Sequence, residues 1–205
     1  MNKKIVIFDL LGVITKESMF ATNIIYPLVK NRVSYDLFKK KYLLYAIGNI
    51  EAVDFWKFIC LKKEIKKIEE KIIAKTLLTS GIRDIIHNLT SLNCELYLAT
   101  EIPKRWGELL LDKAGIKNMF KKKFYSSDLL TTKPFSKFYE LVFENIKGND
   151  IYHVDDTLIN LIAAQEIKKH TKIFYNYSND IASSREIDYK INNLNEIEKI
   201  CKLKK

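Results

Sequence analysis

Several apolar runs in this sequence end at a residue type that can take part in chemistry. Each run resembles a buried strand, and the residues at or just after the strand ends are Asp9, Thr100, Lys133, Asp155 and Asp156. Mg²⁺ prefers carboxylate oxygens in proteins, usually together with substrate phosphate and water. A bound cation lets an anionic carboxylate attack an anionic phosphoryl group, and a lysine adds positive charge where negative charge develops. The residue types therefore suit an anionic substrate held on a divalent metal such as Mg²⁺, with Asp9 as a nucleophile or a metal ligand.

These residues can act together only if the fold brings the strand ends to one place. After residue 80, apolar runs alternate with helical periodicity, which predicts a parallel sheet with helices on both faces. The strands are predicted at Ile5–Asp9, Glu95–Thr100, Phe124–Ser127, Ile151–Val154, Lys172–Tyr175 and Tyr189–Ile191. The helices are predicted at Ile82–Leu92, from Pro103 onward, and at Phe135–Ile146, Leu158–Ile167 and Asn195–Cys201. In a doubly wound α/β sheet of this kind, the carboxyl ends of the strands converge on one crevice.

The segment between the first two predicted strands has a different pattern. Phe38, Tyr42 and Tyr45 recur at three- and four-residue spacing, which is typical of a helix. Helical patterns continue up to residue 79, so we expect an all-helical domain inserted after the first strand. The predicted domains are an α/β core formed by residues 1–16 and 80–205, and a helical insert formed by residues 17–79.

Four stretches of the sequence, in order and with compatible spacing, resemble the motifs of the haloacid dehalogenase-like hydrolase superfamily. They are Ile5–Val13, Leu96–Thr100, Ser126–Pro134 and Ile151–Asp156. The helical insert resembles the small cap of that superfamily, and Tyr45–Trp56 is similar to the branch that contains the epoxide hydrolase N-terminal phosphatase domain. The resemblance covers nearly the whole chain and implies a Rossmann-like α/β core with an inserted helical cap.

The resemblance also implies a role for each candidate residue. Asp9 would attack phosphorus and form an aspartyl-phosphate, Thr100 would hydrogen-bond a phosphoryl oxygen, and Lys133 would order both groups. Asp156 would bind Mg²⁺ directly and Asp155 through water. The implied metal ligands are thus Asp9, Asp155, Asp156 and the backbone carbonyl of Leu11, and the residues expected to bind a small phosphorylated substrate are Thr100, Lys133 and the neighbouring Glu101.

Leu11 departs from the superfamily pattern. Phosphatases of the superfamily usually carry a second Asp there, which protonates the leaving group and then activates water, and such help is worth about 10²–10⁴ in rate. Three interpretations stay open: a slow or specialised phosphatase in which Glu17, Glu101 or water supplies the proton; a metal-independent 2-haloacid dehalogenase-type hydrolase, whose halide leaves without a proton; or an impaired phosphate-binding or self-phosphorylating protein. The dehalogenase branch typically has Ser-Ser-Asn where this chain has its acidic pair. We therefore favour the Mg²⁺-dependent phosphatase.

The composition argues against several other classes of protein. The 205 residues have a net charge of +10, but nearly all of the positive charge is lysine, and arginine, which reads bases bidentately, is scarce. No apolar run approaches the ~18 residues of a membrane span, and no signal peptide is recognisable. Three cysteines without a Cys-x-x-Cys pair favour reduced thiols. We expect a cytoplasmic monomer or homodimer that binds neither nucleic acid nor membranes.

Overall fold

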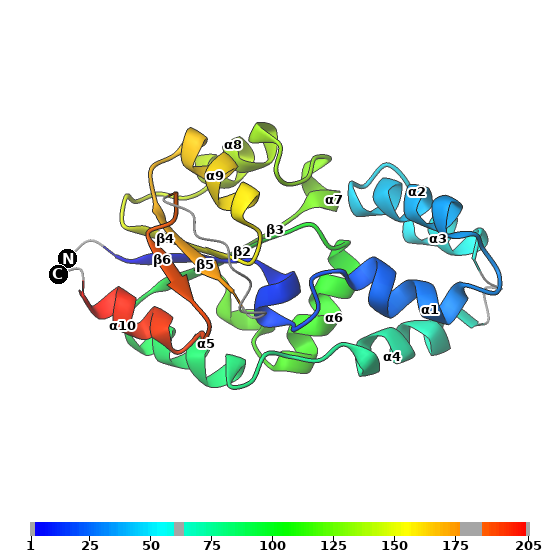
Figure 1. The fold of residues 1–205 in the computed structure, drawn as a ribbon, viewed down its shortest axis with the longest axis horizontal. Coiled ribbons are helices and arrows are strands. Elements are labelled where there is room, and N and C mark those ends of the chain that lie inside the picture. The colour runs from blue at the N-terminus through cyan, green and yellow to red at the C-terminus, as the bar shows by residue number, and fades with distance from the viewer. Residues whose placement is uncertain (1–2, 60–63, 177–185, 204–205) are drawn as a thin grey trace.

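The computed structural model describes residues 3–59, 64–176 and 186–203. Within these residues, six parallel strands form one sheet in the order β3-β2-β1-β4-β5-β6 (Figure 1). The strands are β1 (Ile5–Phe8), β2 (Glu95–Thr100), β3 (Lys122–Tyr125), β4 (Ile151–Asp155), β5 (Thr171–Tyr175) and β6 (Tyr189–Ile191). The predicted α/β class with a parallel sheet is confirmed.

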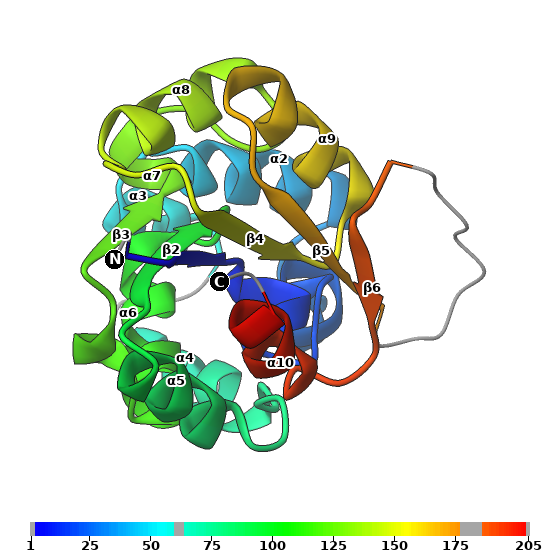
Figure 2. The same ribbon diagram turned by 90° about the vertical axis from the view of Figure 1, so that its left-hand side faces the viewer.

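Helices cover both faces of the sheet because the central strands are apolar on both sides. Ile5 and Ile7 belong to a hydrophobic cluster with α8 and α9, whereas Val6 and Phe8 belong to a cluster with α5, α6 and α10. Figure 2 shows these two groups of helices on opposite sides of the sheet. A strand buried on both faces has a continuous apolar sequence, as the run before Asp9 does. The helices are α5 (Ile82–Ser91), α6 (Lys104–Ala114), the short turn η4 (Lys117–Met119), α8 (Ser136–Glu144), α9 (Leu158–Ile167) and α10 (Glu196–Leu203).

The strand register brings the carboxyl ends of three strands together. Phe8 of β1 pairs with Leu98 of β2 and with Val154 of β4, so the residues that follow these positions are neighbours across the sheet. Asp9 continues the pairing, because its backbone N–H donates to the Val154 carbonyl at 3.0 Å. The strand order, with β1 between β2 and β4, therefore places Asp9 between Thr100 and the acidic pair.

One predicted strand is wrong at its carboxyl end. We predicted a strand over Phe124–Ser127, but β3 ends at Tyr125, and the next residues form the short helix α7 (Ser126–Leu129). The neighbouring strand β2 ends at Thr100, which pairs with Tyr125. Since β2 offers no backbone partner beyond that point, the chain leaves the sheet and turns.

The described residues between β1 and α5 form helices and turns, apart from one short antiparallel bridge. That bridge joins Thr15 to Leu78, so the two segments that connect the helical insert to the core run side by side. The domain boundaries after residue 16 and before residue 80 stay a prediction. The elements are the turn η1 (Leu10–Ile14), η2 (Ala21–Ile25), α1 (Tyr26–Val29), α2 (Tyr35–Ala46), α3 (Ala52–Lys57) and α4 (Ile65–Lys75).

The helical insert packs against α6 on the side to which the carboxyl ends of the strands point (Figure 1). Arg105 of α6 makes a bidentate ion pair with Glu69 of α4, at 2.6 and 2.7 Å. Next to it, the ring centroid of Trp106 lies between 5.3 and 6.2 Å from those of five aromatic residues: Phe20, Tyr42, Tyr45, Phe55 and Trp56. Aromatic contacts and bidentate pairs have specific geometries, so they define one orientation of the insert on the core.

Two expectations about the whole chain can be compared with the structure. Cys94 and Cys201 are free cysteines, whereas Cys60 lies outside the described residues. In the part of the chain that the structure describes, no helix combines the length and the apolar character that crossing a bilayer requires.

Candidate active site

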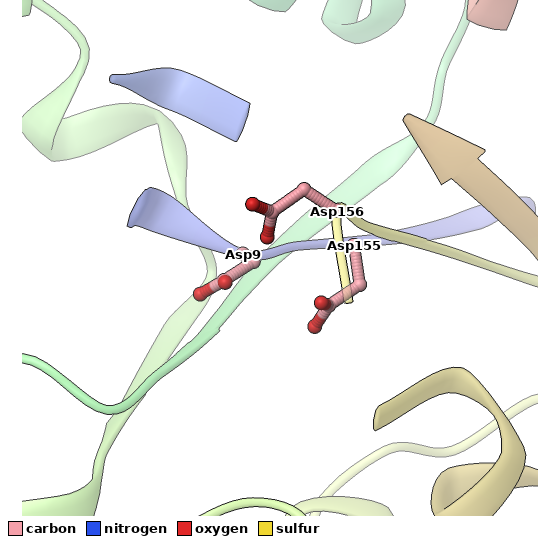
Figure 3. Close-up of side chains that lie close together, drawn as sticks. All are labelled: Asp9, Asp155 and Asp156. Atoms are coloured by element: carbon pink, nitrogen blue, oxygen red, sulfur yellow. The ribbon is translucent and has the colours of Figure 1, made fainter. Parts of the chain in front are cut away.

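Three aspartates meet where β1 and β4 end. One carboxylate oxygen from each of Asp9, Asp155 and Asp156 lies within 4.8 Å of the other two, and Figure 3 shows the three side chains gathered at the strand ends. Hard divalent cations are bound by carboxylate oxygens at short range. Three of the four predicted metal-binding positions thus come together at a spacing that suits a single shared cation.

The fourth position, Leu11, lies in the turn η1 directly after β1. Its backbone is extended, and Gly12 beside it has a φ of +74°, a conformation that favours glycine. A Cβ atom on Gly12 would lie 2.0 Å from Oδ2 of Asp156. The same turn is closed by Asp9, whose Oδ1 accepts a hydrogen bond from the Leu10 N–H at 2.7 Å. Glycine is therefore needed both for the backbone angle and because the turn passes so close to the Asp156 carboxylate.

Lys133 reaches two of the carboxylates from the segment before α8. Its Nζ lies 2.7 Å from Oδ2 of Asp155 and 3.2 Å from Oδ1 of Asp9, and its side chain is buried. The Asp155 carboxylate also accepts hydrogen bonds from the Thr157 N–H at 2.9 Å and from the Asn160 side-chain amide at 3.1 Å. These contacts hold the lysine and Asp155 in fixed orientations beside Asp9.

The cluster contains more negative charge than one lysine neutralises. Burial raises the pKa of Asp9 well above its usual value, and the neighbouring Asp155 and Asp156 raise it further, against the opposing effect of Lys133. Burial and the Asp155 charge raise the pKa of Asp156 from 3.8 to about 7. Burial alone would lower the pKa of Lys133, but Asp155 and Asp9 hold it well above its usual value. A divalent cation would relieve the repulsion between the carboxylates, so the donor set fits the metal that the sequence implies.

The raised pKa of Asp156 predicts a pH-dependent response to Mg²⁺. Its folded-state pKa is about 7, against an ordinary value of 3.8. Its contribution to the stability of the metal-free protein is therefore complete below about pH 3.8 and is lost as the pH rises through about 7. Because the cation binds the deprotonated carboxylate, we expect Mg²⁺ to raise the Tm more at about pH 8 than at about pH 5.5.

Thermal unfolding with and without Mg²⁺ at both pH values measures this difference. The control is Asp156→Asn, which cannot titrate and should show a small Mg²⁺ shift at either pH. Equal Mg²⁺ shifts for the wild-type protein at both pH values would show that Asp156 does not respond to the cation.

Thr100 is the last residue of β2 and is fully buried. Its hydroxyl has no hydrogen-bond partner among the described residues. An unsatisfied buried hydroxyl is uncommon, because leaving it without a partner costs about 1–3 kcal/mol. The Thr100 hydroxyl is thus available to a ligand oxygen, and its role as a donor to phosphate stays a prediction.

Glu101 belongs to the same electrostatic cluster as the aspartates. Its Oε1 accepts a hydrogen bond from Thr132 Oγ1 at 2.9 Å. Burial raises the pKa of Glu101, and the Asp155 charge adds to the shift, while Lys133 and the Thr132 hydrogen bond oppose it. In turn, Glu101 contributes to the raised pKa of Asp9. Glu101 therefore lies close enough to Asp9 to influence the pKa of its carboxyl group.

Glu17, the other glutamate considered as a proton donor, is engaged elsewhere. Its Oε1 accepts hydrogen bonds from the Met19 N–H at 2.8 Å and from the Asn23 side-chain amide at 3.1 Å. Both partners are in the first part of the helical insert. Its carboxylate thus stabilises the start of the insert, and among the described residues no hydrogen bond or ion pair joins it to the three aspartates.

No role was predicted from the sequence for three residues that the structure places around the site. Thr132 stands next to Lys133 in the sequence, and Asn160 lies at the start of the helix that follows the acidic pair, so proximity in sequence could have indicated both. Tyr42 gives no such signal. It lies in the helical insert, where burial raises the pKa of its phenol and the Glu101 charge raises it further. Only the packing of the insert on the core brings Tyr42 close to Glu101.

Comparisons with known proteins agree with this fold. The model of the haloacid dehalogenase-like hydrolase family matches residues 3–168. A search of curated protein sequences produced no match. Among solved structures, a HAD phosphatase from Thermococcus onnurineus is 22% identical, with a TM-score of 0.72 over 97% of each chain. The L-2-haloacid dehalogenase from Xanthobacter autotrophicus is 12% identical, with a TM-score of 0.68 over 99% of this chain and 100% of its own.

A further similar structure has been determined with bound ligands. It is a HAD family enzyme from Bacteroides thetaiotaomicron in complex with magnesium and inorganic phosphate, 17% identical, with a TM-score of 0.65 over 88% of this chain and 98% of its own. Identities this low establish a common fold and not a common substrate. The family match, in contrast, spans most of the chain. The chain therefore belongs to the haloacid dehalogenase-like hydrolase family, and it is a hydrolase. These matches do not distinguish the branch within the family.

Proposed function

We propose that this hydrolase is a Mg²⁺-dependent phosphatase that removes phosphate from a small phosphate ester through an aspartyl-phosphate on Asp9. The observation that carries the proposal is the group of three carboxylates within 4.8 Å of one another. Burial raises the pKa of Asp9 and Asp156 there, so the negative charge of the ionised carboxylates is not compensated without a cation. The relative that binds magnesium and inorganic phosphate supports the same interpretation.

Each residue of the cluster has a part in the proposed reaction. Asp9 and Asp156, with the backbone carbonyl of Leu11, would hold Mg²⁺, and Asp155 would hold it through water. The cation, when bound, supplies positive charge that lets a carboxylate approach a phosphoryl group. Asp9 attacks phosphorus through its second carboxylate oxygen. Lys133 lies 3.2 Å from Asp9 and keeps the attacking group oriented.

Substrate recognition completes the proposal. Thr100, whose buried hydroxyl has no partner among the described residues, would donate to a phosphoryl oxygen. We infer that the helical insert acts as a cap, because only 5% of the surface of Asp9 is exposed. A nucleophile this deeply covered reacts with a small molecule that fits beneath the insert, and closure of such a lid excludes water from the reaction.

A metal-independent dehalogenase is the second candidate, because the dehalogenase from Xanthobacter autotrophicus has a similar fold. The acidic cluster argues against it. Displacement of a halide by Asp9 needs no cation, so Asp155 and Asp156 would only add repulsion beside the nucleophile, as their effect on the pKa of Asp9 indicates. Buried like charges are retained where a metal or a substrate charge compensates them.

Hydrolysis of an aryl phosphate tests the proposal directly. An aryl oxide leaves with little need for a proton, so we expect turnover with Mg²⁺, and a loss of about 10²-fold or more after the metal is removed with EDTA. Release of halide from 2-haloacids, measured with EDTA present, is the parallel assay. Metal-independent halide release without phosphatase activity would support the dehalogenase. Stable labelling of Asp9 by beryllofluoride without turnover of any phosphate ester would support the impaired phosphate-binding protein.

A further inference from the structure

The proposed reaction lacks a proton donor at the position where Leu11 stands. When the bond between phosphorus and the leaving oxygen breaks, the electron pair goes to that oxygen. If the product is an alcohol, the oxygen would leave as a strongly basic alkoxide unless it receives a proton. An acid at the site typically contributes about 10²–10⁴ in rate. The side chain of Leu11 cannot donate a proton, so another titratable group or a water molecule has to do so if alcohols are to leave.

Glu101 lies at that boundary. It directly follows Thr100 at the carboxyl end of β2. The hydroxyl of Ser126 lies 2.8 Å from the Glu101 carbonyl oxygen and 2.6 Å from the carbonyl oxygen of Ala46 in the insert. One hydroxyl thus touches both the core strand end and the insert. The leaving group of a substrate attacked by Asp9 would occupy the same boundary, since the insert is proposed above to act as the cap.

The surroundings of the Glu101 carboxyl raise its pKa, which shifts the group toward its protonated form. On the core side it interacts with Asp9 and Asp155, and on the insert side with the phenol of Tyr42. Burial raises its pKa, and Asp155 adds to the shift, although Lys133 and the hydrogen bond from Thr132 oppose it. A protonated carboxyl beside an incoming phosphate also avoids repulsion between two anions. Two carboxyl groups whose surroundings differ, such as the partly buried Glu101 and the buried Asp9, can take separate acid and base roles.

We propose that Glu101 is the general acid and base of this site, in place of a side chain at position 11. The inference rests on the phosphatase function proposed above. In the first step, Asp9 forms a bond to phosphorus, the bond from phosphorus to the leaving oxygen breaks, and the Glu101 proton passes to that oxygen. The products of this step are the free alcohol, the aspartyl-phosphate and the Glu101 carboxylate.

The second step restores the enzyme. The Glu101 carboxylate takes a proton from a water molecule as the water oxygen bonds to phosphorus. The bond from phosphorus to Asp9 breaks, and its electron pair returns to the Asp9 carboxylate. Phosphate leaves, and Glu101 is protonated again, so the cycle consumes one ester and one water.

Glu101→Gln tests the assignment, because glutamine has the same shape and still accepts the Thr132 hydrogen bond but carries no titratable proton. The substrates are a series of substituted phenyl phosphates that differ in the basicity of the phenol. For the variant we expect kcat/KM to fall by about 10²–10⁴-fold with the most basic phenol and by less than about tenfold with the most acidic one. The kcat should fall with every substrate, because water activation is lost, and covalent phosphoenzyme should accumulate as a burst of phenol release.

Two further variants separate catalysis from folding. Glu17→Gln is the matched control, since the Glu17 carboxylate accepts hydrogen bonds from Met19 and Asn23 of the insert, and it should leave both kinetic constants unchanged. Leu11→Asp in the Glu101→Gln background should recover part of the lost kcat/KM for basic phenols, because it returns a carboxyl group close to the nucleophile.

The outcomes are distinguishable. An equal fall of kcat/KM for all phenols, or no fall for any, overturns the role of Glu101 while leaving an Asp9-dependent phosphatase in place. If the wild-type protein hydrolyses none of the phosphates with Mg²⁺, the phosphatase function and the role of Glu101 fall together. A steeper dependence on phenol basicity with an accumulating phosphoenzyme supports both.

Discussion

Asp9→Asn is expected to reduce Mg²⁺-dependent hydrolysis of an aryl phosphate by roughly 10⁴-fold or more, the scale seen when a nucleophile is removed. Asparagine keeps the shape of the side chain and can still accept the hydrogen bond from the Leu10 N–H, which measures 2.7 Å in the structure. Its amide, however, does not attack phosphorus. Steady-state release of the aryl alcohol measures the loss, and the initial burst from phosphoenzyme formation should be absent.

The stability of the same variant shows whether the loss is chemical. Burial and the neighbouring aspartates raise the pKa of Asp9, so its ionised form is unfavourable in the metal-free protein. The neutral Asn side chain removes that repulsion, and the metal-free variant should therefore have a Tm equal to or above that of the wild type. Residual activity above about a tenth of wild type would mean that Asp9 is not the nucleophile.

Lys133→Met is expected to destabilise the metal-free protein by about 3–5 kcal/mol near neutral pH, the usual result of leaving a buried charge without its partner. Methionine has a similar length, but it leaves Asp155 and Asp9 without the ammonium group that lies 2.7 and 3.2 Å from them. Denaturant unfolding measures the change in the free energy of unfolding. Phosphatase activity should also be lost, because Lys133 no longer orients Asp9.

The matched control for this prediction is Lys137→Met. Lys137 also pairs with a carboxylate, Glu140 at 3.2 Å, but both side chains are largely exposed, so the change should be below about 1 kcal/mol. Adding Asp155→Asn to Lys133→Met should recover part of the lost stability, since it removes one of the two unpaired charges. Similar losses for Lys133→Met and Lys137→Met would contradict a special electrostatic role for Lys133.

The sequence was sufficient for the parts of this protein that depend on local pattern. The strand before Asp9 is apolar at every position because it is buried on both faces. Apolar runs of this kind that alternate with helices are typical of a parallel α/β sheet. The acidic pair could be assigned to the same site as Asp9 because strand ends in such a sheet converge. That reasoning depends only on order along the chain, and the structure bears it out, with the three carboxylates within 4.8 Å of one another.

Other features depend on contacts between residues far apart in the sequence, and only the tertiary structure decided them. Ser126 lies outside the sheet because the neighbouring strand β2 ends at Thr100, the partner of Tyr125. The residues of β3 themselves give no indication of where β2 ends. In the sequence, nothing distinguishes Glu101 from an exposed glutamate. In the structure, Thr132 of the core donates a hydrogen bond to it, and its charge acts on the phenol of Tyr42 in the insert. Burial and neighbouring charge determine the pKa of a carboxyl group, and both arise only when distant segments pack together. For that reason the sequence alone indicated Asp9 as the candidate nucleophile, whereas only the packing of the insert on the core indicated Glu101 as the candidate proton donor.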